Sequence, residues 1–191
     1  MSCGSLFIYF NSHPIKPRIL TIYDWVSDAV LRLVLLRPIN PNRTNQRVDH
    51  EEVNTMEACA AIDELLEPAV ICKNLFLTNS AKTEYYLLML CADKKFRTAE
   101  VSKQIGASRL SFADSDKMLE FLDITPGSVS VMGLMNDHEH RVHLIVDEDV
   151  FRSEYFGCHP CINTSSLRIK TKDVFEKVLP ELGVEYRTVS V

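Results

Sequence analysis

The sequence predicts an α/β protein with a mixed, mostly antiparallel sheet and helices packed around it. Segments with strand-like patterns outnumber those with helical patterns along the chain. Two neighbouring apolar runs, Val70–Leu77 and Glu84–Cys91, flank a short polar turn and predict a hairpin. The remaining strand-like segments are separated by helix-like ones, which requires crossover connections. Hairpins and crossovers together predict a mixed sheet.

The N-terminal part of the chain divides into three segments. Residues 1–20 contain two prolines and no clear period, so we interpret them as an appendage to a domain that spans residues 21–191. Apolar residues recur at helical spacing in Thr21–Leu36 and predict a helix there. Prolines and asparagines then predict a loop over residues 37–45.

The rest of the chain alternates helical and strand-like patterns. Helices are expected where apolar residues recur every three or four positions beside capping residues: Thr55–Leu66 after Asn54, Thr98–Ile105 before Gly106, Ser115–Leu122 after Asp114 or Ser115, and Asp173–Leu182 after Thr171 or Lys172 and before Gly183. Strands are expected in short apolar or alternating runs: Gln46–Asp49, Val70–Leu77, Glu84–Cys91, Arg109–Phe112, Ser128–Leu134, Arg141–Asp147, Ser165–Lys170 and Val184–Val189. Turns and loops are expected at Thr125–Gly127, Asn136–His140 and Gly157–Asn163.

The composition is that of a folded globular protein. Of the 191 residues, 46% are hydrophobic and 25% are charged, which is typical of folded rather than disordered chains. Charged residues interrupt every apolar stretch before it reaches bilayer length, and the start has no signal-like pattern, so we expect a cytoplasmic protein without a membrane partner. The net charge of −5 does not indicate a nucleic-acid binder, but a local basic patch can suffice. A monomer or a homodimer fits this size.

Lys73 stands out because it interrupts an apolar strand. Side chains on a strand alternate between faces, so one face of 70–77 carries Ile71, Lys73, Leu75 and Leu77, and the other carries Cys72, Asn74 and Phe76. A cationic amine among aliphatic side chains is costly to desolvate unless something compensates it. An edge-strand lysine that discourages sheet pairing is the alternative, but apolar residues flank Lys73 on both sides. We therefore interpret Lys73 as a candidate site residue.

A second candidate stretch reads Gly157-Cys158-His159-Pro160-Cys161. Glycine and proline predict a tight loop that presents His159, either as a functional group or as a residue that closes the loop. Cys158 and Cys161 form a C-x-x-C pattern, but a zinc site needs a second ligand pair and a redox site needs a helix after the first cysteine. A β-prone segment follows instead. We expect both cysteines to be reduced and unpaired.

Three further patterns are open to a functional and a structural interpretation. Residues 137–143 contain two acidic residues and three histidines, but they fall at an expected hairpin turn, so we predict a solvated turn and no metal site. The glycines and turn residues of 125–129, with Gly133, either offer backbone N–H groups to an oxygen or form an ordinary turn. A basic cluster either follows phosphates or forms a solvated surface; it comprises Lys94, Lys95, Arg97, Lys103, Arg109 and Lys117.

Five short motifs occur in a fixed order: Cys72–Leu77, Arg109–Ala113, Thr125–Val129, Gly133–Asp137, and Gly157–Pro160 with Asn163 and Thr164. Together they resemble the YbaK/ProX family of free-standing aminoacyl-tRNA editing proteins, and they look closest to its prolyl-tRNA editing branch. The resemblance covers roughly residue 21 to the C-terminus. Val131 departs from the pattern, since many relatives have proline there.

The resemblance implies a mixed α/β editing fold and hydrolysis of a mischarged tRNA, above all Ala-tRNA(Pro). It implies a catalytic role for Lys73 and His159, no cofactor, and a cavity sized by the helix over 55–66. Substrate-binding residues would be Asn74, Gly127, Ser128, Gly133, Gly157, Pro160 and Asn163. The tRNA would contact Lys94, Lys95, Arg97, Lys103 and Arg109, and prolyl-tRNA synthetase is a candidate partner.

This chemistry suits the residues present. An aminoacyl ester is already activated, so its hydrolysis needs an ordered water and a polarised carbonyl but neither a nucleophilic side chain nor a metal. The general base stays open, because the ribose hydroxyl of the substrate can serve. Two other functions also stay open: a module that binds tRNA or another nucleic acid without turnover, and a thiol redox protein that uses Cys158 and Cys161.

Overall fold

The computed structural model describes residues 45–52 and 56–191. The expected appendage, the helix over Thr21–Leu36, nearly all of the loop over 37–45 and the cap Asn54 lie outside the described residues. Within the described part, no helix is long and apolar enough to cross a membrane.

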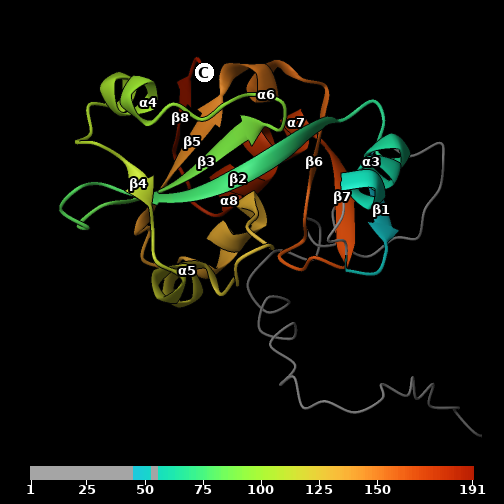
Figure 1. The fold of residues 1–191 in the computed structure, drawn as a ribbon, viewed down its shortest axis with the longest axis horizontal. Coiled ribbons are helices and arrows are strands. Elements are labelled where there is room, and N and C mark those ends of the chain that lie inside the picture. The colour runs from blue at the N-terminus through green and yellow to red at the C-terminus, as the bar shows by residue number, and fades with distance from the viewer. Residues whose placement is uncertain (1–44, 53–55) are drawn as a thin grey trace, which may run out of the picture.

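An eight-stranded mixed sheet forms the centre of the described part, with helices placed around it (Figure 1). Its strands run in the order β1-β7-β6-β2-β3-β5-β8, and β4 pairs with β2 outside this path. Four pairings are antiparallel (β1–β7, β6–β7, β2–β3 and β2–β4) and three are parallel (β2–β6, β3–β5 and β5–β8). The predicted mixed α/β class is confirmed, and antiparallel pairs outnumber parallel ones only narrowly.

Most strand predictions are confirmed with small shifts at the ends. The strands are β1 (Gln46–Asp49), β2 (Val70–Thr78), β3 (Tyr85–Cys91), β4 (Ser111–Phe112), β5 (Val142–Asp147), β6 (Tyr155–Cys158), β7 (Ser165–Lys170) and β8 (Tyr186–Val189). The β2–β3 hairpin pairs Cys72 with Cys91 through to Thr78 with Tyr85. The sequence therefore located the hairpin at the middle of the sheet.

The predicted helices also form. They are α3 (Met56–Leu65), α4 (Thr98–Ile105), α5 (Ser115–Leu122), and a last segment made of α7 (Thr171–Asp173), the π-helical η2 (Val174–Val178) and α8 (Leu179–Glu181). Gly106 ends α4 in the left-handed conformation at φ 72°, and Asp114 is the N-cap of α5. The last helical segment begins two residues earlier than expected, at Thr171, and Lys170, rather than Thr171 or Lys172, is its N-cap.

The predicted strand over Ser128–Leu134 is wrong. This segment instead contains the 3-10 helix η1 (Val131–Asn136), and Ser130 caps it by accepting a hydrogen bond from the Met132 N–H through its side chain. Val131, Met132 and Leu134 are all buried against the core, whereas a half-buried strand would expose alternate residues. The run of apolar residues resembled a strand, but the serine cap and the buried Gly133 favour a tight helical turn.

Two other differences lie near the C-terminal half of the sheet. Residues 157 and 158 were expected in a loop, but they complete β6, where Gly157 pairs with Arg168 and Cys158 with Leu167 of β7. A short helix that sequence patterns did not predict, α6 (Glu148–Arg152), begins at the N-cap Asp147 directly after β5. The loop therefore starts at His159, and β5 ends in a capped helix.

Two hydrophobic clusters cover the two faces of the central strands. One contains Phe76, Leu87, Met89, Leu144 and Val146, and the other contains Leu77, Tyr86, Leu88, Leu90 and Ile145. Adjacent strand residues thus alternate between clusters, as the period of two predicts, and β3 is buried along its whole length. The predicted division of β2 into two faces is confirmed.

Gly133 allows η1 to pack closely against the residues that follow α5. A Cβ atom at this position would lie 2.3 Å from Ile124 Cδ1 and 3.3 Å from Leu122 Cβ. We predict that Gly133→Ala lowers the free energy of unfolding by about 1–3 kcal/mol, the usual cost of overpacking a core, measured by urea denaturation. Ile124→Val removes the clashing methyl group, so the alanine should cost less in that background. An equal cost in both backgrounds would contradict this packing explanation.

Candidate functional site

Strand β2 changes partners along one of its edges. Its whole length from Cys72 onward pairs with β3, whereas the opposite edge pairs with β6 only at Val70 and Ile71 and with β4 only at Leu77 and Thr78. Among the described residues no strand pairs with that edge at positions 72–76, although the Phe76 carbonyl accepts a hydrogen bond from Ala113 N. Ligands commonly bind where neighbouring strands part in this way. Lys73 and Asn74 lie in this interval.

The ammonium group of Lys73 is held by backbone carbonyls. Its Nζ donates to the Ala92 oxygen at 3.1 Å and to the Lys94 oxygen, both in the turn after β3. No carboxylate among the described residues forms an ion pair with it. A lysine has three N–H donors, so one remains for another acceptor. Lys73 is half-buried, and its acceptors among the described residues are these two carbonyls.

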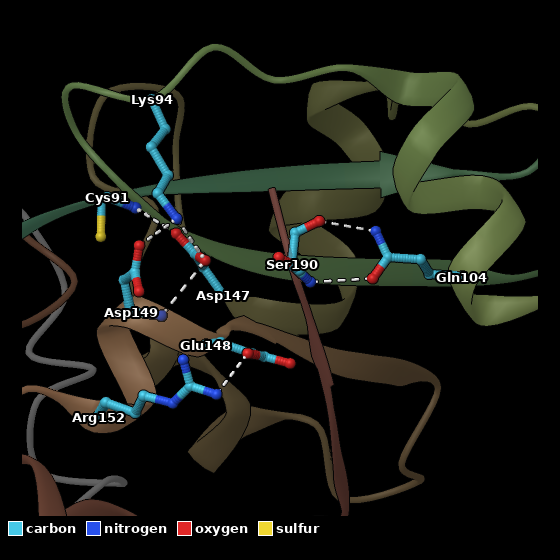
Figure 2. Close-up of polar contacts among 8 residues, drawn as sticks. All are labelled: Cys91, Lys94, Gln104, Asp147, Glu148, Asp149, Arg152 and Ser190. Atoms are coloured by element: carbon cyan, nitrogen blue, oxygen red, sulfur yellow. Dashed lines mark hydrogen bonds and ion pairs between the residues drawn. The ribbon is translucent and has the colours of Figure 1, made fainter.

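A buried ion pair fixes the turn that holds Lys73 (Figure 2). Lys94 Nζ lies 2.9 Å from Asp147 Oδ1 and 2.6 Å from Asp149 Oδ2. Asp147 has no exposed surface, and its other oxygen accepts a hydrogen bond from Cys91 N at 3.5 Å. Burial by itself would lower the pKa of Lys94, but hydrogen bonds and charges from Asp149 and Asp147 outweigh it and raise that pKa. The end of β3, its turn and α6 are thus tied together.

This arrangement changes the interpretation of Lys94. Sequence reasoning placed it among the residues that contact tRNA, but its ammonium is occupied by two carboxylates and its side chain is only 22% exposed. We therefore exclude Lys94 from the proposed RNA surface. Its function is to hold the turn, and sequence reasoning missed its partner Asp147. The available signal was an acidic residue placed directly between a strand and a helix, which is an N-cap position.

Asn74 points to the opposite face of β2 from Lys73. Its side-chain oxygen Oδ1 is buried and has no hydrogen-bond partner among the described residues. Buried polar atoms are nearly always paired in folded proteins, so this oxygen is an acceptor that a water molecule or a ligand donor can fill. The buried Ser128 and Ser130 follow the turn at Gly127, whose φ of 91° requires glycine. Asn74 remains a candidate for substrate binding on chemical grounds.

Gly157 lies in β6, the strand that parts from β2, and His159 begins the loop that follows β6. Gly157 is the register partner of Ile71, and a Cβ at this position would lie 2.9 Å from Ile71 Cδ1, so glycine permits the close approach of these strands. His159 Nδ1 donates to the Ser165 carbonyl at 3.0 Å, which leaves Nε2 as an acceptor in the neutral ring. Burial raises the pKa of Asp63 on α3, and the nearby His159 opposes that rise. Leu66, directly after α3, would lie 3.4 Å from a Cβ at Gly157, so the end of α3 lies beside β6.

Asn163 and Gly133, both predicted to bind substrate, have structural roles in this fold. Asn163 Nδ2 donates to Glu52 Oε1 at 2.6 Å and so ties the loop to the segment after β1. Gly133 lies inside η1, where Ile124 fills the space beside it. Pro160 is half-buried in the loop next to His159. We keep Pro160 as a residue that shapes the loop.

The two cysteines of the C-x-x-C pattern are poor candidates for redox chemistry. Burial raises the pKa of the Cys158 and Cys161 thiols to about 12 each. Cys158 ends β6, and an irregular loop follows rather than a helix whose N-terminus would stabilise a thiolate. At neutral pH both thiols are protonated.

The predicted solvated turn at 136–140 is only partly correct. His140 N donates to the Asp137 carbonyl, which closes the turn. Asp137 itself is buried, and its carboxylate accepts a hydrogen bond from Val142 N at 2.7 Å. No group of three or more potential metal ligands gathers among the described residues. Asp137 joins the turn to the start of β5.

The remaining predicted basic residues lie on the surface, and a pocket lies elsewhere in the fold. Lys95, Arg97, Lys103 and Arg109 are exposed, and Arg97 pairs with Glu100 at 3.0 Å. A pocket of about 390 Å³ lies at the start of β3 and β5. Its lining includes Glu84, His143 and Arg187 but none of the predicted site residues.

Comparison with known proteins adds independent information. The sequence model of a family described as "Aminoacyl-tRNA editing domain" matches residues 50–177. The chain is 28% identical over 144 residues to the prolyl-tRNA editing protein ProX of Acetoanaerobium sticklandii, which covers 75% of this chain and 87% of ProX. It is 31% identical over 132 residues to a human putative prolyl-tRNA synthetase associated domain-containing protein 1, which covers 66% of this chain and 76% of the relative.

Solved structures share the fold at low sequence identity. A putative trans-editing enzyme for prolyl tRNA synthetase aligns with a TM-score of 0.56 at 15% identity, over 77% of this chain and 87% of that chain. The hypothetical protein APE2540 aligns with a TM-score of 0.57 at 16% identity, over 78% and 92% of the two chains. These likenesses concern the fold alone.

The Lys94–Asp147 pair gives a testable prediction. Lys94→Met leaves the fully buried Asp147 carboxylate without its counter-charge, so we expect a loss of about 3 kcal/mol in the free energy of unfolding, measured by urea denaturation. Arg97→Met is the matched control, because it removes an exposed ion pair with Glu100 and should cost less than about 1 kcal/mol. Equal losses in the two variants would contradict a special role for the Lys94 pair.

Proposed function

This chain belongs to the aminoacyl-tRNA editing domain family, and from that membership and the geometry around Lys73 we propose that it deacylates mischarged tRNA in trans, with Ala-tRNA(Pro) as its main substrate. The observation that carries the proposal is the Lys73 ammonium, which two carbonyls and, among the described residues, no carboxylate hold, on a stretch of β2 whose second edge no described strand pairs with. Relatives named for prolyl-tRNA editing and for association with prolyl-tRNA synthetase support this substrate class.

In the proposed reaction a water molecule attacks the carbonyl carbon of the aminoacyl ester. The carbonyl oxygen gains negative charge in the tetrahedral intermediate, and the bond to the ribose oxygen then breaks. The proton released by the water passes to that ribose oxygen, so the products are a free amino acid and an uncharged tRNA. The remaining N–H donor of Lys73 is suited to stabilise the oxyanion or the adjacent phosphate, since preorganised donors act at developing charge.

Other residues of the site would position the substrate. The unpaired Asn74 Oδ1 suits an N–H or O–H donor of the substrate, such as a ribose hydroxyl or the α-amine. His159 Nε2, free to accept in the neutral ring, suits the attacking water or the substrate amine. These roles require no metal ion or cofactor. We leave the general base to the substrate's own ribose hydroxyl.

Selectivity would follow from size. An editing site removes amino acids that are small enough to enter it, which separates alanine from the larger cognate proline. The end of α3 lies beside β6, where Leu66 would be 3.4 Å from a Cβ at Gly157, and α3 is the element that we propose limits that space. Prolyl-tRNA synthetase is a proposed partner that would deliver the misacylated tRNA.

The alternatives have weaker support from the structure. A module that only binds nucleic acid does not need a half-buried ammonium held by backbone carbonyls. A thiol redox protein needs an accessible thiolate, whereas the thiols of Cys158 and Cys161 have a raised pKa of about 12.

The first test of the proposed function is the removal of Lys73. We expect Lys73→Ala to slow the deacylation of Ala-tRNA(Pro) by at least about 100-fold, because deleting one preorganised donor to an oxyanion has effects of that order. Release of labelled alanine from purified mischarged tRNA is the measurement. Lys172→Ala, which removes an exposed lysine on α7, is the control and should keep the parent rate. A folded Lys73→Ala protein with the parent rate would refute the proposal, and a panel of other mischarged tRNAs would show whether alanine is preferred.

A second test separates hydrolysis from thiol chemistry. We expect the Cys158→Ala, Cys161→Ala double variant to retain deacylation, since neither thiol is ionised at neutral pH and neither takes part in the proposed reaction. Circular dichroism would verify that the variant is folded. Loss of deacylation by a folded variant would favour the thiol mechanism over the one proposed here.

A further inference from the structure

Phe112 is an exposed aromatic residue with no role in the core. Its side chain is 66% exposed on β4, a strand of only two residues. Its ring meets that of Phe96 edge-on, with 6.1 Å between ring centroids. Phe96 in turn packs against the cluster formed by Leu77, Leu88 and Leu90. We call the pair of Phe96 and Phe112 the aromatic ledge.

Basic residues surround the ledge in the sequence. Residues 94–109 contain five basic side chains and one acidic side chain, in a chain whose net charge is −5. Lys94 is turned inward to Asp147, but Lys95 and Arg97 flank Phe96 directly and Arg109 lies three residues before Phe112, and all three are exposed. Figure 1 shows α4 and β4 at the same end of the sheet, away from α3 and β1. Exposed cationic side chains therefore lie close to both rings in the sequence.

The ledge is on the same side of the sheet as Lys73. Phe112 is the register partner of Leu77, and Leu77 shares a face of β2 with Leu75 and Lys73. Leu77 lies four positions after Lys73, a distance of about 13 Å along β2. The segment 92–97 begins at the carbonyls that hold Lys73 and leads to Phe96. The ledge and the candidate site are thus connected by one strand face and one short segment.

We infer that the aromatic ledge stacks an unpaired base of the tRNA 3′ end, next to the terminal aminoacyl-adenosine, while Lys95, Arg97 and Arg109 contact the phosphates. This inference rests on the proposed function, because it places the rest of the substrate relative to Lys73. Exposed aromatic rings within a basic surface are the usual way in which proteins hold single-stranded nucleic acid without reading its sequence. The charge around the rings favours an anionic partner over an apolar protein surface.

The test compares substrates with and without the upstream nucleotides. We expect Phe112→Ala to raise the KM for Ala-tRNA(Pro) between about fivefold and a hundredfold, the range found for the loss of one base–aromatic stack, with little change in kcat. Hydrolysis of 3′-alanyl-adenosine, which has no upstream nucleotide, should be equal in the variant and the parent. Phe112→Trp retains a stacking surface and should restore the KM for the tRNA.

A matched control and a binding measurement make the outcome independent of catalysis. Leu119→Ala removes another exposed apolar side chain, 48% exposed on α5, and should leave both substrates unaffected. A single-stranded oligonucleotide ending in CCA should quench the added fluorescence of the Phe112→Trp protein, measured against the parent, which contains only Trp25. The fluorescence measurement tests oligonucleotide binding even if the parent protein hydrolyses neither substrate. The lack of hydrolysis would refute the proposed function but not the stacking of a base on the ledge.

Three results would overturn the inference. One is an unchanged KM for tRNA in a folded Phe112→Ala protein. Another is an equal loss on tRNA and on 3′-alanyl-adenosine, which would place Phe112 in the site itself. The third is a change of oligomeric state: the parent protein sediments as a dimer, whereas the Phe112→Ala protein is monomeric and binds the oligonucleotide as well as the parent does. That result would show that a second copy of the chain covers the ledge.

Discussion

The candidate site depends on how a single positive charge is kept on an apolar strand. Lys73 has no carboxylate partner among the described residues, so its ammonium is solvated by the carbonyls of Ala92 and Lys94. Those carbonyls lie in a turn, and a turn on its own is a mobile support. Here the Lys94 side chain reaches inward to Asp147, whose carboxylate is fully buried and also binds the backbone of β3. The side chain of Lys94 thereby fixes its own backbone carbonyl, and that carbonyl positions the Lys73 ammonium.

This arrangement has an electrostatic advantage over a direct ion pair. A carboxylate beside Lys73 would neutralise the ammonium and compete with an anionic substrate or intermediate. Carbonyl dipoles stabilise the cation without cancelling its net charge, so attraction to a developing oxyanion is retained. The nearby carboxylates of Asp147 and Asp149 pair with Lys94 instead. The backbone carbonyl of Lys94 is one of the two that bind Lys73. Lys94 therefore holds the turn, and under the proposed function Lys73 keeps its charge for the substrate.

The sequence predicted those parts of the fold that depend on local pattern. Hydrophobic periodicity and helix capping act within a few residues. They predicted the β2–β3 hairpin, the two faces of β2 and the end of α4 at Gly106. The errors arose where distant contacts decide. The 128–134 segment resembled a strand until the cap at Ser130 and the fit of Gly133 against Ile124 favoured a 3-10 helix. The orientation of Lys94 could not be predicted because Asp147 is more than fifty residues away in the sequence.

The unpaired edge of β2 explains why both faces of this strand can serve one substrate. Positions 73 and 74 point to opposite faces, so Lys73 and Asn74 would be separated by the sheet if another strand paired beside them. Strand β6 ends its pairing at Ile71 and β4 begins only at Leu77, so the edge between them is unoccupied by any strand that the structure describes. A ligand at that edge can approach the ammonium from one face and the unpaired Asn74 oxygen from the other. The change of strand partners, rather than the proximity of side chains on one face, is then what assembles the site.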